Sequence, residues 1–547
     1  MFKYLKDKLA KIPRHIWILL AIIMIGIFLR TYNFHDWLRF SMDQSRDAQI
    51  ISDVVEGKIN FPLLGPLAGG TYFHLGPVYY YFSIISAKLF GNYPDKIAYP
   101  SLFFAILTIP LLFLFLKEYF SKNTSLFLTA IISFSYFFIE DSRFSSNPHL
   151  IPFFVLLILY AFLKLINGSS VKKWIWISVL GISFGIAVQL HTTLLVLTPV
   201  FIFLIFIIYD HWGLLNFKQL LLVFIIALFL NIPQFISEYN TRGQNKENFF
   251  AAIVSNEDSD SSFLKKSREA FICQAKANVN MISSFPAENE CSKSIDLDIK
   301  KGAKELFGEI KDKSLRKGVY IASIIIIFVF FVFGYSLMFY NLIKEKSKDR
   351  KNFLILVFVY NFCALLFLIP IISSISISYF NILFFIPFVF IGMIQEFLSK
   401  RGKLVGKIIS LLIFIGIFSS IIFFNTKNYF YFKNGLDNNL ENSNLGWAEN
   451  VGKFIVKNSN EKEVIYLSGE RKYLNRFEGP LNHMVSRENI RMVEIDASNI
   501  DDMIPNGENF FYIKNFNDEK IKGFIGDYEV INGKHFSPVD IYILKNN

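Results

Sequence analysis

The chain has 547 residues, of which 53% are hydrophobic, 17% aromatic and only 18% charged. About a quarter of the residues in an average soluble domain are charged, so this composition excludes an ordinary soluble globular protein. Phe, Ile and Leu gather in continuous blocks long enough to cross a hydrocarbon core of about 30 Å. The net charge of +11 lies mainly in short segments between these blocks, which is typical of an oriented membrane protein and not of a nucleic-acid-binding protein.

The apolar blocks predict eleven membrane-spanning helices. They lie at about 16–30, 97–117, 124–140, 149–167, 174–190, 192–209, 218–236, 319–343, 352–371, 379–398 and 404–424. The expected fold class is therefore an all-α polytopic membrane protein.

A further apolar segment, PVYYYFSIISAKLF at 77–90, is short for a span and contains Lys88. A crossing there would send every later basic loop outside, against the positive-inside rule. With a cytoplasmic N-terminus and 77–90 lying flat, basic loops such as 344–351 (KEKSKDRK) and 399–407 (SKRGKLVGK) face the cytoplasm. We therefore predict an amphipathic helix at the outer interface, with its tyrosines at headgroup depth.

This topology divides the chain into a membrane domain, 1–425, and a small soluble α/β domain, 426–547, on the exoplasmic side of a plasma membrane. Two long loops, 31–96 and 237–318, also lie outside. In the tail, AENVGKFIVKNS predicts a helix, and KEVIYLSG, RMVEID, ENFFYIKNF and VDIYILKN predict strands. Cys273 and Cys291 fall in one outer loop, where they could pair.

The outer segment after the first span contains two carboxylates, Asp43 and Asp47, four residues apart. A helix from residue 43 would put both on one face, with Arg46 one turn from Asp43. One interpretation is a catalytic pair, with Asp43 as a general base at the water edge of the bilayer. The alternative is a charged loop helix with an internal salt bridge.

Candidate substrate-binding residues lie in this and other outer segments. They are Arg46, His74, Tyr79, Arg143, Asn147, His191 and Tyr379. The planar guanidinium of Arg143 suits phosphate recognition. For Arg143, the alternative is a pairing with Glu140 or Asp141. The alternative for His74 is a hydrated interface histidine. For His191 it is a helix-capping turn, and for Tyr379 it is an ordinary aromatic of the membrane belt.

The candidates come from five separate segments, and the topology places all of them on the outer face. That topology was fixed by Lys and Arg in other loops. A carboxylate with a ring of cations fits transfer from a phosphate-linked lipid. The carboxylate would deprotonate an acceptor hydroxyl, and the cations would stabilise charge on the leaving phosphate.

Five motifs, in order DQSRDA, HLGPVYYYF, SRFSSNP, QLHTT and SYFNILFFIPF, give a resemblance to a known family. Over about residues 10–425 the chain resembles the GT-C-fold lipid-phosphate-sugar glycosyltransferases, as a bacterial relative of the protein O-mannosyltransferases and the aminoarabinose transferase. The resemblance implies an exoplasmic active site, Asp43 as catalytic base, a polyprenyl-phosphate-linked sugar donor and inversion at the anomeric carbon.

The chain also departs from this family. Gln44 stands where members often have a second carboxylate, which Asp47 could replace. His74 stands at a position often filled by Lys, and Ser378 precedes Tyr379 where a cationic residue is common. Asn147 lies in a stretch without the Asp that some relatives supply, so no residue is assigned to a metal.

The predicted function is a glycosyltransferase that moves a sugar from a polyprenyl-phosphate donor to an acceptor hydroxyl. No nucleotide is needed, since the chain lacks a phosphate-binding glycine loop. No cofactor is assigned, a divalent cation is left open, and the acceptor is a protein, lipid or glycan. The alternatives are a lipid-linked sugar transporter or flippase, disfavoured by the apolar span centres, an oligosaccharide ligase or polymerase, and a non-catalytic scaffold.

Overall fold

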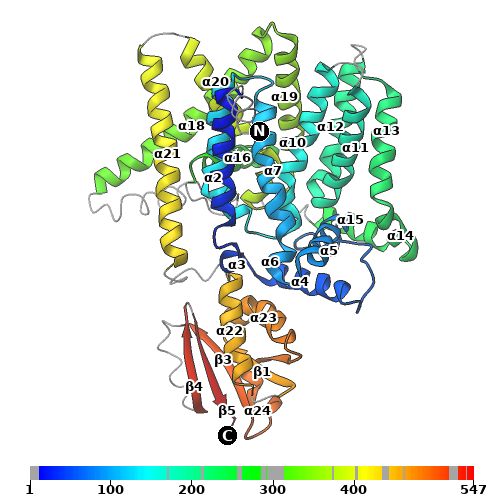
Figure 1. Ribbon diagram of the computed structural model, residues 1–547, viewed down its shortest axis with the longest axis vertical. Helices are drawn as coiled ribbons and strands as arrows, with labels where there is room; N and C mark the ends of the chain where they lie inside the picture. The colour runs from blue at the N-terminus through cyan, green and yellow to red at the C-terminus, as the bar shows by residue number, and fades with distance from the viewer. Residues whose placement is uncertain are drawn as a thin grey trace, which may run out of the picture.

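The computed structural model describes the chain over twelve stretches. These are 12–168, 172–210, 215–255, 262–284, 291, 313–372, 375–400, 404–433, 443–459, 462–515, 528–537 and 539–546. They form a helical bundle with a small α/β domain beyond one end (Figure 1). We call this end of the bundle the domain-side end.

Most of the long helices of the bundle run roughly parallel to one another, whereas α18 lies obliquely to them (Figure 1). The helices of the bundle are α2 (Arg14–Thr31), α7 (Tyr99–Leu116), α8 (Lys122–Phe134), α9 (Tyr136–Asp141), α10 (Ile151–Asn167), α11 (Lys173–Leu190), α12 (Thr192–Asp210), α13 (Phe217–Leu230), α14 (Ile232–Asn240), α16 (Phe263–Ser283), α18 (Lys313–Lys344), α19 (Lys348–Leu368), α20 (Ile386–Lys400) and α21 (Leu404–Lys433).

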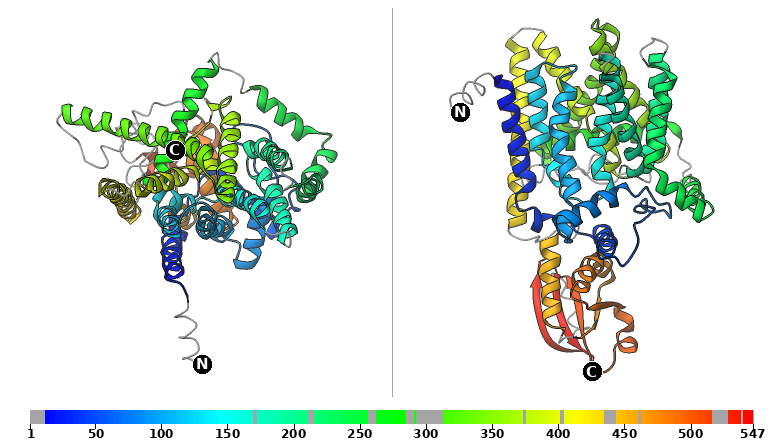
Figure 2. Two further views of the ribbon diagram at one scale, coloured as in Figure 1. Left: turned by 90° about the horizontal axis from the view of Figure 1, so that it is seen from above. Right: turned by 45° about the vertical axis from the view of Figure 1, so that its right-hand side comes forward.

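Short elements connect the bundle at its domain-side end. They are α3 (Phe34–Trp37), α4 (Met42–Val55), α5 (Val78–Phe90), α6 (Pro94–Ile97) and α15 (Gln244–Ser255), with the 3-10 helices η1 (Asn147–Leu150) and η4 (Ile377–Leu383). The region of α4 and α5 lies between the bundle and the C-terminal domain (Figure 2, right).

The predicted class, a polytopic helical membrane protein, is confirmed. In the described part of the chain, 8 helices are long and apolar enough to cross a membrane, or up to 10 if two bent pairs each form one span. The pairs α13–α14 and η4–α20 each bend by 58°. Pro233 and Pro387 lie just after these breaks, where proline's missing N–H does not interrupt a helix.

The segment predicted as a span at 124–140 is two helices, α8 and α9, separated at Ser135. The Ser135 hydroxyl donates to the Met281 carbonyl at 2.8 Å. The Tyr136 amide, which loses its helical acceptor at the break, donates to the Ser284 hydroxyl at 2.8 Å. The end of α16 therefore satisfies the polar groups that the break exposes.

The helix α5 covers the segment predicted to lie at the interface. At 1.5 Å per residue its 13 residues extend about 20 Å, short of a hydrocarbon core of about 30 Å. It packs against α4 and α11 at the domain-side end. Its length agrees with a helix that does not cross the bilayer.

The predicted C-terminal α/β domain is confirmed. It contains α22 (Leu445–Lys457), β1 (Val464–Gly469), α23 (Arg471–Ser486), β2 (Arg491–Asp496), η5 (Ala497–Asn499), α24 (Ile500–Met503), β3 (Asn509–Asn515), β4 (Glu529–Phe536) and β5 (Val539–Lys545). The sheet order is β2-β1-β3-β5-β4, with β1 parallel to β2 and β3, and β5 antiparallel to β3 and β4.

Residues 38–40 join three distant parts of the chain. The Arg39 amide donates to the Arg143 carbonyl at 2.9 Å, and the Phe40 amide donates to the Ser443 carbonyl at 3.0 Å. The Leu445 amide donates to the Leu38 carbonyl at 2.8 Å. Buried residues of α22 and α23 share one continuous core with the bundle. The C-terminal domain is therefore packed onto the bundle and not merely tethered to it.

Cys273 on α16 and Cys291 form a disulfide, with Cα atoms 5.1 Å apart. The pairing that the sequence left open is thus present in the structure. Within the predicted outer loop 237–318, residues 256–261, 285–290 and 292–312 lie outside the described ones. Cys363 is a buried free thiol.

The disulfide gives a first prediction. Protein denatured without reductant should take up one maleimide–polyethylene glycol tag, on Cys363, and reduction should raise this to three, since the chain has 3 cysteines. Gel mobility measures the number of tags, and Cys363→Ser removes the first one as a control. Because disulfides persist in oxidising compartments, three tags without reductant would argue against an exoplasmic position for this loop.

Candidate active site

The helix α4 begins directly after the join at residues 38–40. Ser41 and Gln44 form a capping box, in which the two side chains satisfy amide groups of the first turn. Asp43 lies in that first turn, where a carboxylate interacts favourably with the positive end of the helix dipole. Local sequence therefore fixes both the start of α4 and the position of Asp43.

One arginine holds both predicted catalytic carboxylates. Arg46 Nη1 donates to Asp43 Oδ1 at 2.9 Å, and its Nη2 and Nε donate to Asp47 Oδ1 at 2.9 and 3.0 Å. The Asp43 side chain is 70% exposed, whereas that of Asp47 is 3% exposed. The predicted salt bridge and the predicted shared face are both present, but the two carboxylates meet different environments.

Asp47 faces α5. Tyr80, a buried residue of α5, donates its hydroxyl proton to Asp47 Oδ1 at 2.9 Å. Asp47 Oδ2 is buried with no hydrogen-bond partner in the structure as described. Burial raises the pKa of Asp47 to about 6, because desolvation outweighs the attraction of Arg46. Asp43 is therefore the carboxylate that a solvent-borne group can reach, and Asp47 anchors the helix.

The beginning of α5 is tied to the segment after α9 and to α11. Tyr79 is hydrogen-bonded to the Ser145 hydroxyl at 2.9 Å. The Val78 amide donates to Gln189 Oε1 at 3.2 Å. Asn147 Nδ2 donates to the Leu190 carbonyl at 2.6 Å. Tyr79 and Asn147, predicted as substrate ligands, thus hold three of the predicted segments together.

His191 and Tyr379 meet at the same end of the bundle. Their rings pack edge to face with centroids 4.6 Å apart. The Thr193 amide donates to His191 Nδ1 at 3.1 Å, so Nδ1 is unprotonated and Nε2 carries the ring proton. Burial lowers the pKa of His191 to about 4, which keeps the ring neutral near pH 7. His191 can donate a hydrogen bond there, but it does not supply a positive charge.

His74 lies in a loop that α15 fastens. Its Nδ1 donates to the Gly65 carbonyl at 2.8 Å. Its backbone amide donates to Asn245 Oδ1 at 2.7 Å, and Asn245 Nδ2 returns a bond to the His74 carbonyl at 3.0 Å. These contacts order the loop before α5, and none of them joins His74 to the Asp43–Asp47 pair.

Arg143 binds backbone carbonyls, and its predicted contact with a phosphate stays a prediction. Its Nη2 donates to the carbonyls of Leu29 and Tyr32 at 3.0 and 2.6 Å, and its Nη1 donates to that of Asn33 at 3.4 Å. The guanidinium lies 5.3 Å from the centre of the Trp37 ring. Helix ends leave carbonyls without partners, and Arg143 caps those of α2. None of these described hydrogen bonds goes to Glu140 or Asp141.

An aspartate–histidine pair, Asp141 with His149, was not among the site residues predicted from the sequence. Asp141 Oδ1 lies 2.6 Å from His149 Nδ1, with both side chains largely buried, and Asn381 Nδ2 lies 3.4 Å from the same oxygen. The sequence signal was an acidic residue at the end of α9 and a histidine just after Asn-Pro. The sequence offered Asp141 only as a partner of Arg143, and His149 had no predicted role. Among the described residues, no group of three or more His, Cys, Asp or Glu side chains is placed to hold a metal ion.

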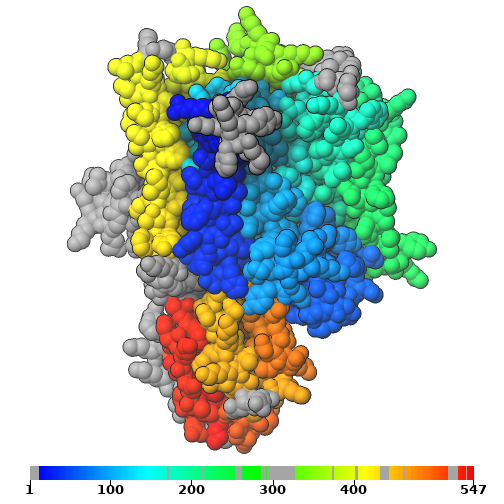
Figure 3. Space-filling view, in the orientation of Figure 1, coloured from blue at the N-terminus to red at the C-terminus, as the bar shows by residue number. Residues whose placement is uncertain are grey.

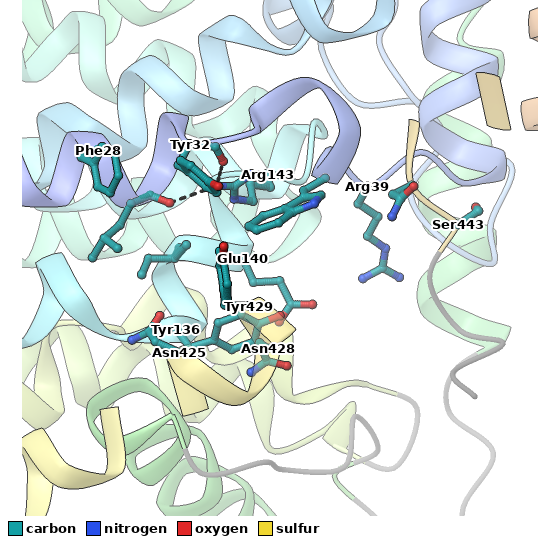
Figure 4. Close-up of a pocket in the computed structure, with 14 residues that line it drawn as sticks. Phe28, Tyr32, Arg39, Tyr136, Glu140, Arg143, Asn425, Asn428, Tyr429 and Ser443 are labelled. Atoms are coloured by element: carbon teal, nitrogen blue, oxygen red, sulfur yellow. Dashed lines mark hydrogen bonds between the residues drawn. The ribbon is translucent and has the colours of Figure 1, made fainter. Parts of the chain in front are cut away.

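A cavity of about 340 Å³ is lined by Glu140, the residue before Asp141 (Figure 4). It is enclosed by the domain-side ends of α2 and α21, by α9 and by the segments around residues 37–39 and 443–444. The lining residues are Phe28, Leu29, Tyr32, Trp37, Arg39, Tyr136, Ile139, Glu140, Arg143, Asn425, Asn428, Tyr429, Ser443 and Asn444. It is largely apolar, with a few polar groups, as small-molecule pockets usually are.

The C-terminal domain packs α23 directly against α4. Gly479 is close enough that a Cβ there would lie 2.6 Å from Met42 Sδ and 2.7 Å from Ser45 Oγ. One turn further on, His483 Nδ1 lies 3.1 Å from Gln49 Oε1. The helix that carries Asp43 is thus held between α5 on one side and α23 on the other.

The helical bundle with a small domain beyond one end agrees with the predicted GT-C-type membrane fold, and comparisons with known proteins support that fold. Residues 74–236 match the family model described as dolichyl-phosphate-mannose-protein mannosyltransferase. The chain is similar to ArnT from Cupriavidus metallidurans bound to undecaprenyl phosphate, with TM-score 0.52, 11% identity and coverage of 97% of each chain. Apo ArnT gives TM-score 0.52 and 11% identity over 96% of this chain and 97% of that one.

An apo oligosaccharyltransferase from Archaeoglobus fulgidus aligns with TM-score 0.49 and 14% identity over 88% of this chain and 64% of its own. No curated protein sequence matches the chain. The protein is therefore a multi-pass membrane protein that shares the GT-C fold of ArnT, and its residues 74–236 resemble the mannosyltransferase family model. The family resemblance predicted from the motifs is confirmed.

The environment of Asp47 predicts the sign of a stability change. The folded protein holds the Asp47 proton more tightly than an unfolded chain, whose carboxyl has the ordinary pKa of 3.8. Stability should therefore fall as the pH rises from about 4 to about 6. Asp47→Asn should flatten this dependence and leave the melting temperature at pH 7 unchanged or a few degrees higher, as measured by thermal unfolding in detergent.

Asp53→Asn on the same helix serves as the control, because Asp53 lies at the solvent-exposed end of α4 beside Lys58. A clear fall in the melting temperature of Asp47→Asn at neutral pH would mean that the ion pair with Arg46 outweighs the cost of burial.

The packing of α23 predicts a localised effect of Gly479→Val. The larger side chain should separate α23 from α4 and expose the 38–45 segment, while the C-terminal domain keeps its own fold. Hydrogen exchange should rise about tenfold or more across residues 38–49 and stay unchanged in β1, β3 and β5. Gly416→Val is the matched control, since a Cβ there meets nothing within 4 Å. Equal protection in the two variants would contradict the close packing.

Proposed function

We propose that the protein is a glycosyltransferase that moves a sugar from a polyprenyl-phosphate donor to an acceptor hydroxyl at the outer face of the plasma membrane, with inversion. The observation that carries the proposal is the exposed carboxylate of Asp43. It stands at the start of α4, at the domain-side end of a GT-C-type bundle, and a buried network orients it through Arg46.

In the proposed reaction, Asp43 takes the proton of the acceptor hydroxyl as its oxygen attacks the anomeric carbon of the donor. The new carbon–oxygen bond forms on the face opposite the phosphate. The bond between the anomeric carbon and the phosphate oxygen breaks, and its electron pair leaves with the polyprenyl phosphate. A single displacement of this kind inverts the anomeric configuration.

Charge on the leaving phosphate needs donors that are already in place. Arg46 is the cation next to Asp43, and it has two roles in the proposal: it orients Asp43 and offers positive charge at the water edge. The neutral N–H of His191 and the hydroxyl of Tyr379 would donate hydrogen bonds to the donor. Since Arg143 caps α2, its role is to hold the site's framework.

The relatives support a lipid-phosphate donor. The ArnT structure contains undecaprenyl phosphate, and the matching family is described by a dolichyl-phosphate sugar. The Cys273–Cys291 disulfide supports an oxidising, exoplasmic setting for the domain-side end. The N-terminus would then lie in the cytoplasm and the C-terminal domain outside.

Asp43→Asn tests the proposal. Because a general base contributes about 10²–10⁴-fold, the variant should lose transfer by about that factor with little change in the KM for the donor. Product formation from labelled polyprenyl-phosphate sugar in proteoliposomes is the measurement. Asp53→Asn, a matched carboxylate on the same helix, should retain activity. Full transfer by Asp43→Asn excludes Asp43 as the base, and donor flipping without a new glycosidic bond would indicate a transporter instead.

A further inference from the structure

The aromatic cavity at the edge of the bundle is not used by the chemistry described so far. Two of its walls are membrane-spanning helices: Phe28 belongs to α2 and Tyr429 to α21, each near the domain-side end of a candidate span. Figure 3 shows these two helices side by side on one face of the bundle, directly above the C-terminal domain. The cavity therefore lies where the hydrocarbon of a bilayer meets its headgroups.

The cavity is reached from the surface that faces lipid. Phe28 is 59% exposed and Tyr429 is 38% exposed, although both line the cavity. In a membrane these faces contact acyl chains and not water. A chain from the surrounding bilayer can thus reach the aromatic wall without crossing an aqueous phase.

The other side of the cavity is polar. Glu140, Asn425 and Asn428 line it together with Arg39, and the Glu140 carboxylate extends toward Arg39 (Figure 4). Arg39 precedes Asp43 by four residues, so their Cα atoms are at most about 14 Å apart. A molecule with its apolar part among the aromatic rings would place its polar part next to the candidate catalytic helix.

The chemistry of the lining indicates which substrate would fit. A peptide carries an amide N–H and C=O at every residue, and an apolar wall would leave them without partners. The donor's phosphate would compete with the Glu140 carboxylate for Arg39, because the other lining arginine, Arg143, already donates to the carbonyls of Leu29 and Tyr32. A neutral hydroxyl headgroup, by contrast, can donate to the Glu140 carboxylate and to the side-chain oxygens of Asn425 and Asn428, whose Nδ2 groups already donate to backbone carbonyls.

We propose that this cavity binds the acceptor, and that the acceptor is a membrane lipid with a hydroxylated, uncharged headgroup and at least one apolar chain. The inference rests on the proposed glycosyl transfer only in calling the bound lipid the acceptor. The binding site itself stands on the cavity alone. The chain lies against Phe28, Trp37, Tyr136 and Tyr429, and the headgroup hydroxyl points past Glu140 and Arg39 toward Asp43.

Binding is tested without any reaction. The full-length protein in phosphatidylcholine nanodiscs is irradiated with an octyl glucoside that carries a diazirine in its chain, and the labelled peptides are identified by mass spectrometry. Labelling should map to α2, α9 and the 425–429 stretch of α21, and excess octyl glucoside should compete with it, whereas methyl glucoside should not. Labelling spread evenly over the lipid-facing surface would overturn the proposal.

Asn428→Trp, which fills the cavity from α21, should reduce the specific labelling about tenfold or more. Ile422→Trp is the matched control on the same helix, because Ile422 is 65% exposed on the bilayer side. Equal labelling in the two variants would overturn the site.

Transfer then tests the acceptor class. With the labelled donor, kcat/KM for octyl glucoside should exceed that for methyl glucoside about tenfold or more, and Asn428→Trp should raise only the acceptor KM. An increase in the donor KM would place the donor's chain in the cavity, and transfer to peptides unaffected by Asn428→Trp would point to a protein acceptor. Specific labelling without any transfer would instead contradict the proposed function and leave the lipid site in place.

Discussion

The carboxylate of Asp47 is buried where α4 meets α5, and the candidate site depends on how that charge is accommodated. Arg46 and Tyr80 both bind its Oδ1, and the same guanidinium continues to Asp43 in the solvent. One buried group thereby fixes the rotation of α4, the direction of Arg46 and the place of the exposed carboxylate. Burial makes this arrangement costly for a charged Asp47, so its position is better explained by site geometry than by stability.

Segments that are distant in sequence are held around this network mostly by side-chain to backbone hydrogen bonds. Asn147 and Gln189 connect the segment after α9, the start of α5 and the end of α11, while Arg143 closes the last turn of α2. Near the hydrocarbon, unpaired carbonyl and amide groups are expensive, so each break in a helix needs such a partner. The polar residues at this end therefore divide into those that satisfy the backbone and those that remain available for substrate.

The helical membrane fold and the strands β1, β2, β3 and β5 were predictable, because hydropathy and alternation sum over many residues. The strand β4 was not predicted, since nearly all of its residues are exposed. The break at Ser135 was not, since its partners Met281 and Ser284 lie about 150 residues away in the chain. The site divides in the same way. The Asp43–Arg46–Asp47 contacts were predictable, because they follow from helical spacing. The capping role of Arg143 and the pairing of Asp141 with His149 depend on how separate helices end beside one another.

The join at residues 38–40 also has a consequence for biosynthesis. The Ser443 hydroxyl that binds the Phe40 carbonyl is 403 residues further along the chain. At about 5–20 residues per second, the ribosome needs on the order of 20–80 s to make the intervening stretch. During that time the 38–40 backbone is without its hydrogen-bonding partners from residues 443–445. The nascent loop is thus exposed to proteases and chaperones until the last fifth of the protein emerges.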